Sequence, residues 1–151
     1  MSVAIADPTA TLLAALYADA ATVAAVTHAR PDGTSAVAIY GESLPLDPLM
    51  DEQIPAVAGA ALVLAMQPGP VDAYAPLSYP RALLRAYHRT RQQARALWFA
   101  VAPVLHNRRF TQGNGRAINV SLASTPTVTL ELDTRFPLCD GFFSCEVVGH
   151  E

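Results

Sequence analysis

Residues 81–98 read Arg81-Ala-Leu-Leu-Arg-Ala-Tyr-His88, then Arg89-Thr90, then Arg91-Gln-Gln-Ala-Arg-Ala-Leu-Trp98. Side chains alternate along residues 81–88, with Leu84 and Ala86 on one face, and this period of two predicts a strand. The opposite, polar face would carry Arg81, Leu83, Arg85 and Tyr87. Thr90 can then cap a helix, because apolar residues recur at helical spacing as far as Leu105. The segment therefore predicts a strand that passes directly into an amphipathic helix.

Before this unit, the sequence predicts a helix and two strands. Asp7-Pro8 is a typical helix start, and Asp19 can cap a second short helix that ends near Val26. Strands are expected at Ala36–Tyr40 and Ala58–Met66. Prolines predict two long loops, Gly41–Pro55 and Pro68–Ser78.

After the unit, the sequence predicts three more strands. Gly113-Asn114-Gly115 indicates a turn. Strands of alternating character follow at Ile118–Leu122, Val128–Leu132 and Phe142–Val148, the last with Phe143, Cys145 and Val147 on one face. The order helix, three strands, helix, three strands predicts an α+β fold, a mainly antiparallel sheet with helices packed on one face.

Composition bounds the class of protein. The chain has 151 residues, of which 52% are hydrophobic and 15% charged, so we expect a single domain spanning 1–151. No run of apolar residues is long enough to cross a bilayer and no signal peptide opens the chain, which predicts a soluble protein without a membrane partner. Cys139 and Cys145 could form a disulfide, and free thiols are the expectation for an unexported chain.

Charge is divided unequally along the chain. Residues 1–80 hold eight acidic residues and one arginine, a net charge of −7, whereas residues 81–151 hold nine arginines and five acidic residues, a net charge of +4. Two surfaces of opposite charge on one chain can meet head to tail between copies. The split therefore predicts self-association.

The residues that could carry chemistry do not form a recognisable catalytic, cofactor or metal site. His28, His88, His106 and His150 show no spacing that lets two imidazoles share a metal ion. The serines lack the context that exposes a nucleophile, and the Gly113–Gly115 cluster precedes a strand rather than a phosphate-binding helix. We therefore expect no enzyme activity, no cofactor and no metal.

The densest charge feature is the run of arginines at 81, 85, 89, 91 and 95. Such a run can be a solvated face, a contact between subunits or a contact to a nucleic-acid backbone. The isoelectric point of about 5.7 argues against nucleic-acid binding as the main function. Candidate interface residues are Arg81, Arg85 and Arg89, which would meet Asp51 and Glu52 of a neighbouring copy.

At this point the chain resembles the tail terminator, or tail completion, proteins of long-tailed bacteriophages. The resemblance rests on the alanine-rich opening helix with Leu12-Leu-Ala-Ala-Leu16 and Asp19-Ala-Ala-Thr-Val-Ala-Ala-Val26, on the strand–helix unit with Gln92-Gln-Ala-Arg-Ala-Leu97, and on the closing Gly141-Phe-Phe-Ser-Cys-Glu-Val-Val148. It covers nearly the whole chain. The proline-rich loop from Leu44 to Pro55 departs from the family pattern.

The resemblance implies a small α+β subunit without an active site. Such subunits form a ring, usually a hexamer, at the head-proximal end of the tail in the virion, after assembly in the host cytoplasm. The ring ends growth of the tail tube and joins it to the head, so the implied partners are further copies, the tail tube protein and the head–tail connector protein. Genome DNA would pass through the ring without sequence-specific binding.

Other functions stay open on the sequence. Related folds serve in the tail tube and in head-closure rings, and a small α+β ligand-binding or regulatory domain with a pocket under the long loops would have the same composition. An enzyme with an unrecognised site is a third alternative. Oligomeric state separates a virion structural protein from a ligand-binding or regulatory domain, because a ring favours the virion role and a monomer or dimer favours the other.

Overall fold

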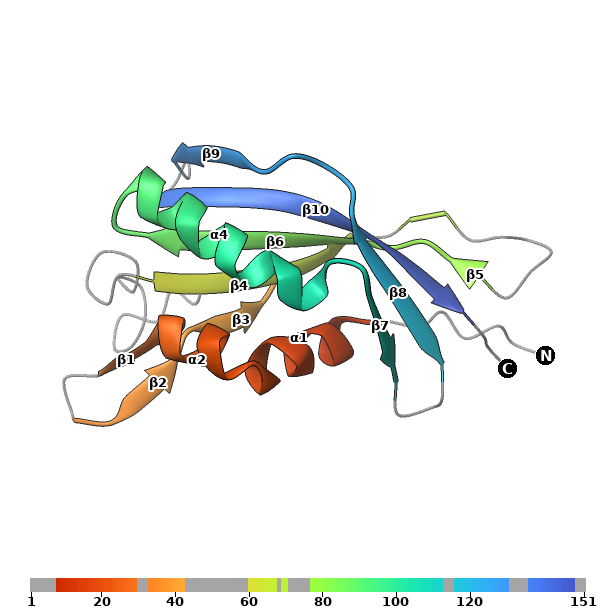
Figure 1. The fold of residues 1–151 in the computed structure, drawn as a ribbon, viewed down its shortest axis with the longest axis horizontal. Helices are drawn as coiled ribbons and strands as arrows, with labels where there is room; N and C mark the ends of the chain where they lie inside the picture. The colour runs from red at the N-terminus through yellow and green to blue at the C-terminus, as the bar shows by residue number, and fades with distance from the viewer. Residues whose placement is uncertain are drawn as a thin grey trace.

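A computed structural model describes residues 8–29, 33–42, 60–67, 69–70, 77–112, 116–130 and 136–148 (Figure 1). Its elements in chain order are α1 Thr9–Ala18, α2 Ala20–Val26, β1 Thr27–Ala29, β2 Ser35–Val37, β3 Ile39–Gly41, β4 Ala60–Gln67, β5 Leu77–Ser78, β6 Arg81–His88, α4 Arg91–Leu105, β7 Arg108–Thr111, β8 Ala117–Leu122, β9 Thr127–Leu130 and β10 Pro137–Val148. Each predicted helix and strand has a counterpart in this order. β1, β5 and β7 are additions.

An eight-stranded sheet forms the body of the described structure. Its main order is β3-β4-β6-β10-β8-β7, and β5 and β9 each pair with β10. All of these pairings are antiparallel except the short parallel pair of β3 with β4. β1 and β2 form a separate two-stranded sheet. The prediction of an α+β fold with a mainly antiparallel sheet is confirmed.

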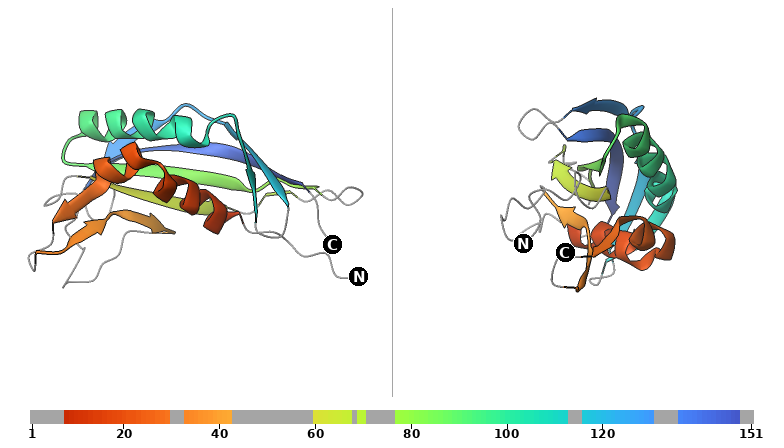
Figure 2. Two further views of the ribbon diagram at one scale, coloured as in Figure 1. Left: turned by 60° about the horizontal axis from the view of Figure 1, so that its bottom comes forward. Right: turned by 90° about the vertical axis from the view of Figure 1, so that its left-hand side faces the viewer.

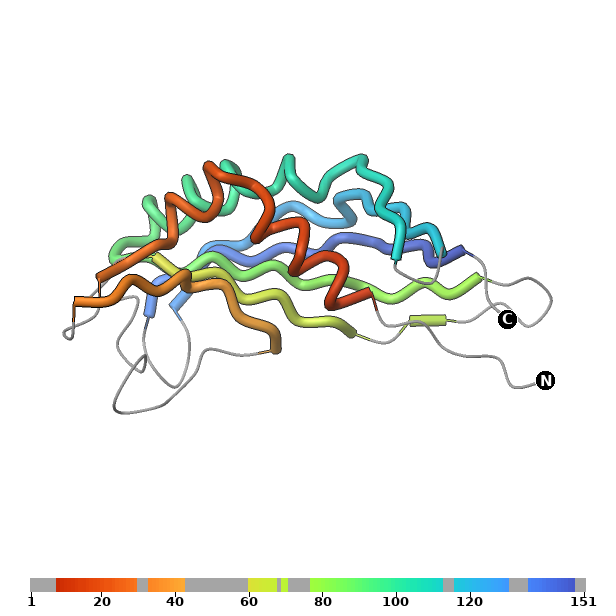
Figure 3. The backbone as a smooth tube through the Cα atoms, turned by 90° about the horizontal axis from the view of Figure 1, so that it is seen from below, coloured from red at the N-terminus to blue at the C-terminus, as the bar shows by residue number. Residues whose placement is uncertain are grey.

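The helices cover one face of the sheet. Figures 2 and 3 show α1 and α4 on the same side of the strands, with α4 running along β6 and β10. The side chains on this face of the sheet include Leu84, Phe143 and Val147, all of which are almost fully buried. The core therefore lies between this face and the helices, where burial of apolar surface stabilises the fold.

Local capping signals set the helix starts. The Thr90 hydroxyl accepts a hydrogen bond of 3.1 Å from the backbone N–H of Gln93, so the predicted cap of α4 is confirmed. Asp19 is also confirmed as a cap, because its carboxylate accepts from the backbone N–H of Thr22 at 3.0 Å. α1 begins directly after Pro8, while Asp7 lies outside the described residues.

The two N-terminal helices are together apolar enough to resemble a membrane segment, but they do not form one rod. α1 and α2 are bent by 87° at Asp19, and no single helix among the described residues is long and apolar enough to cross a bilayer. Leu12, Leu16 and Val26 on these helices are buried in the core.

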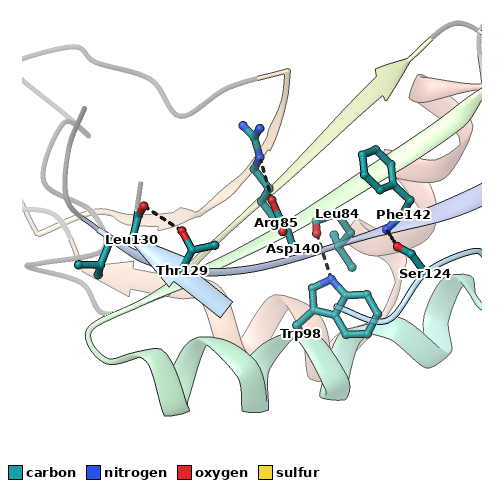
Figure 4. A network of polar contacts seen from close by, with 8 residues as sticks. All are labelled: Leu84, Arg85, Trp98, Ser124, Thr129, Leu130, Asp140 and Phe142. Carbon is teal, nitrogen blue, oxygen red and sulfur yellow. Dashed lines mark hydrogen bonds and ion pairs between the residues drawn. The ribbon is translucent and has the colours of Figure 1, made fainter. Parts of the chain in front are cut away.

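One indole fixes the position of α4 on the sheet. Trp98 is fully buried, and its Nε1–H donates a hydrogen bond of 3.0 Å to the carbonyl oxygen of Leu84 in β6 (Figure 4). Its ring stacks on Phe143 at a centroid distance of 5.8 Å. Gly141 leaves the space that the indole occupies, because a Cβ at that position would lie 2.7 Å from Trp98 Cζ2.

Several strand boundaries differ from the sequence expectation. Residues 36–40 are divided at Ala38, whose N–H bonds to Val26 while its carbonyl accepts from Leu62, so β2 and β3 belong to different sheets. β10 begins at Pro137 because its first half pairs with β9 and its second half with β8. The predicted loop residues 43–55 and the turn at 113–115 lie outside the described residues.

The second face of β6 is less polar than predicted. Leu83 and Tyr87 are 5% and 1% exposed, so only Arg81 and Arg85 give this face its polar character. The predicted alternation of side chains along β6 is confirmed, but apolar side chains are buried on both faces of the strand. The sequence pattern identified the strand and misjudged how much of its second face meets solvent.

Candidate interaction surface

The arginine run predicted as an interface is divided between two sides of the molecule. Arg81 and Arg85 have the same strand parity and point away from the helices, as Figure 4 shows for Arg85 relative to Trp98. Arg91 and Arg95 are exposed on α4, on the other side of the sheet. Arg89 occupies the turn between them, where its backbone N–H donates to His88 Nδ1 at 2.8 Å. The run is continuous in sequence but not in space.

Arg81 is held in place by an aromatic ring. Its guanidinium carbon lies 4.5 Å from the centroid of Phe142 on β10, a cation–π contact, and the residue is exposed. None of the described carboxylates forms a salt bridge with Arg81. An ordered arginine without a charged partner can receive a carboxylate from another molecule.

Arg85 already has a carboxylate partner within the chain. Arg85 Nε lies 3.9 Å from Asp140 Oδ2, a distance too long for a hydrogen bond, and the two side chains are 32% and 28% exposed. Burial raises the pKa of Asp140, and the charge of Arg85 offsets part of that rise. Arg85 is therefore less available than Arg81 to a neighbouring copy. Asp51 and Glu52 lie outside the described residues.

The histidines and serine with defined contacts hold backbone groups. His106 Nδ1 accepts from the N–H of Leu122 at 3.0 Å, beyond the point where β7 stops pairing with β8. Ser124 Oγ accepts from the N–H of Phe142 at 3.2 Å. Burial and the nearby charge of Arg89 lower the pKa of His88. Each of these groups completes the hydrogen bonding of a strand or turn.

No metal-type cluster occurs in the described part of the chain, where no three His, Cys, Asp or Glu side chains converge. Cys139 and Cys145 are free and buried, which confirms the expectation of unbonded thiols. Burial raises the pKa of each thiol to about 11, so neither is a thiolate nucleophile near neutral pH.

The structure adds a second pair of arginines that the sequence reasoning missed. Arg108 and Arg109 begin β7 and, together with Arg81, line a cavity of about 670 Å³ at the end of the sheet. β8 and β10 add the polar side chains of Asn119, Ser121, Ser144 and Glu146 to this lining. The sequence signal was the adjacent pair of arginines directly after the helix. Only the pairing of the strands brings these two arginines to the same cavity as Arg81, and that pairing could not be predicted from the sequence.

Two further hollows lie on the helix side. They measure about 450 Å³ between α1 and β7 and about 580 Å³ between α1, α2 and α4. Alanine dominates their lining, with Phe110 common to both. They present little chemistry for a small ligand, because pockets that bind ligands combine apolar walls with a few converging polar groups.

Comparison with known proteins gives one informative result. No protein-family model matches the sequence, and no curated protein matches it. Among solved structures, a chain described as "Virion of native gene transfer agent (GTA) particle" aligns with a TM-score of 0.60 and 21% sequence identity. The alignment covers 95% of this chain and 100% of that chain. At this identity the likeness establishes a shared fold, and it extends over the full length of the virion chain.

Proposed function

We propose that this chain is a structural virion protein of a tailed phage or phage-like particle. In this role it forms a ring of six copies at the head-proximal end of the tail, where it ends tube growth and joins the tail to the head connector. The observation that carries the proposal is the fold shared with a virion chain over 100% of that chain's length. The proposal assigns no catalysis to the chain and places it in the tail or neck of the virion.

The charge distribution supports self-association. Residues 1–80 carry a net charge of −7 and residues 81–151 a net charge of +4, and a head-to-tail ring brings two different surfaces together at every interface. Arg81 is exposed and has no described acidic partner, so it is the best placed of the three predicted arginines. Arg89 is also proposed to contact the neighbouring copy, and Arg85 contributes less because Asp140 already neutralises part of its charge. Asp51 and Glu52 are the proposed acidic counterparts.

Apolar contacts must supply most of the affinity. Exposed pairs of this kind each contribute about 0 to 1 kcal/mol, and their main effects are on orientation and on the rate of encounter. The wider set of proposed partners is the tail tube protein and the head connector protein. Genome DNA would pass through the ring without base-specific contacts.

The direct test is the mass of the assembly. Native mass spectrometry and sedimentation should detect a closed ring, either with the protein alone or after addition of purified tail tubes, and electron microscopy should locate it at one tube end. Arg81→Glu should weaken assembly, whereas Arg91→Glu on the opposite side should leave it close to the parent. A protein that stays monomeric or dimeric even with tail tubes would contradict the proposal and favour the ligand-binding alternative.

A further inference from the structure

Two ordered rows of polar side chains line part of the cavity at the end of the sheet. Arg81 on β6 is the register partner of Ser144 on β10, which in turn is the partner of Ser121 on β8. Two residues along, Glu146 on β10 faces Asn119 on β8, which faces Arg109 on β7. Register partners on adjacent strands project to the same face, so the six side chains form one surface opposite the helices.

The polar groups of this surface are fixed by one another or by aromatic packing. Asn119 Nδ2 donates to Glu146 Oε1 at 3.1 Å, which occupies the only carboxylate among the six residues of the two rows. Arg81 lies over the ring of Phe142. On β10, Phe142 precedes Ser144 by two residues and Glu146 follows Ser144 by two, so Arg81 leans away from Glu146. Among the described residues, neither Arg81 nor Arg109 forms a salt bridge. The surface thus has an arginine at each side and a carboxylate, hydrogen-bonded to Asn119, near its centre.

This arrangement fits an extended protein segment better than a small anion or a nucleic-acid backbone. Three strand spacings and the two-residue offset separate Arg81 and Arg109 by roughly 15 Å between Cα atoms. Arg81 is turned away from the second row, so the two guanidinium groups do not converge on one phosphate-sized ion. Glu146 near the centre would repel a continuous polyanion. An extended segment matches this surface if two of its carboxylates meet the two arginines and its backbone groups lie over Ser121 and Ser144.

We infer that this cavity is the receptor site for an acidic segment of a second copy of the chain. The inference rests on the proposed ring and identifies the surface through which its subunits recognise each other. Charge complementarity selects the partner, because the arginine-flanked cavity lies in the half of net charge +4 and residues 1–80 carry −7. Asp47 and Asp51 are four residues apart in the sequence, so they would project to the same side of an extended segment. A chain of that length can span at most roughly 14 Å, and the side chains add the reach needed to meet both arginines.

A charge-exchange experiment tests the site. Arg109→Glu should raise the protein concentration at half-assembly by about tenfold or more, while Arg91→Glu, an exposed change on α4, should shift it less than about twofold. The double variant Asp47→Arg with Asp51→Arg should also assemble poorly alone. An equal mixture of this double variant with the receptor double variant Arg81→Glu with Arg109→Glu should recover assembly, because in alternating order every interface then pairs opposite charges. Circular dichroism and the thermal midpoint establish that each variant is folded.

The outcomes separate this inference from the proposed function. If the parent protein forms rings and Arg109→Glu behaves like Arg91→Glu, the receptor site is wrong and the ring stands. If the parent does not assemble even with tail tubes, the proposed function fails as well. If Arg109→Glu assembles normally but loses binding to duplex DNA at low salt, the cavity contacts nucleic acid and the inference is overturned.

Discussion

The contact between Trp98 and Gly141 allows a sharp test of how α4 is seated on the sheet. A methyl group added at Gly141 would lie 2.7 Å from Trp98 Cζ2 and 3.4 Å from the Cα of Pro126. Trp98 cannot move away freely, because it is fully buried and its indole N–H is bonded to Leu84. Overpacking of this kind costs about 1 to 3 kcal/mol, so Gly141→Ala should lower the free energy of unfolding by that amount. The thermal midpoint should then fall by about 2 to 12 °C for a chain of this length.

The control is the same substitution without the indole. Trp98→Ala alone should cost about 3 to 5 kcal/mol, since it removes a fully buried aromatic side chain and leaves a cavity beside Phe143. In that background Gly141→Ala has no indole to clash with and should be close to neutral. Urea unfolding of the four proteins of this cycle should therefore give a coupling free energy of about 1 to 3 kcal/mol. Additive effects would show that the clash is not the reason for glycine at this position.

Three further predictions follow from groups with defined partners. Burial and the charge of Arg89 lower the pKa of His88 in the folded protein, so the unfolded chain binds more protons at pH values between that lowered pKa and the ordinary 6.5. The stability of the protein should therefore fall as the pH falls through this window. His88→Gln should flatten this pH dependence, measured by thermal melts between about pH 5 and about pH 7.5. Thr90→Ala removes the acceptor for the Gln93 N–H and should cost about 1 kcal/mol, measured by urea unfolding; an unchanged midpoint would mean that this cap does not stabilise α4. Cys139 and Cys145 should react with a thiol reagent only as the protein unfolds, because both are buried with a pKa of about 11, and rapid labelling of the native protein would contradict their burial.

The elements with strong local signals could be predicted from the sequence. β6 has the predicted bounds, Arg81–His88, because its alternation is complete and Pro80 precedes it. α4 begins where Thr90 caps it, and Asp19 separates α1 from α2 as expected. In each case the signal and the structure it specifies lie within a few residues of each other.

The elements that depend on long-range pairing could not be predicted in the same way. Arg108–Thr111 has no apolar alternation, and it is a strand because Asn107, with a positive φ of 53°, helps turn the chain and β8 supplies a partner. Leu83 looked solvent-facing by parity alone, yet it is buried on the second face of the sheet. Burial of a strand's second face is decided by distant segments and leaves no mark in the strand's own pattern.

The candidate interface illustrates the same limit for function. The sequence grouped Arg81 with Arg89, Arg91 and Arg95, because only neighbours along the chain can be counted without a fold. Arg81 projects from β6 on one side of the sheet, Arg91 and Arg95 lie on α4 on the other side, and Arg89 lies in the turn between them, so they cannot contribute to one contact in the way a continuous run suggests. Pairing of β7, β8, β10 and β6 instead brings Arg109 onto the face that carries Arg81, where both line one cavity. The charge split predicts which halves of the chain attract each other, and in the proposed site the sheet register determines which arginines could receive the partner.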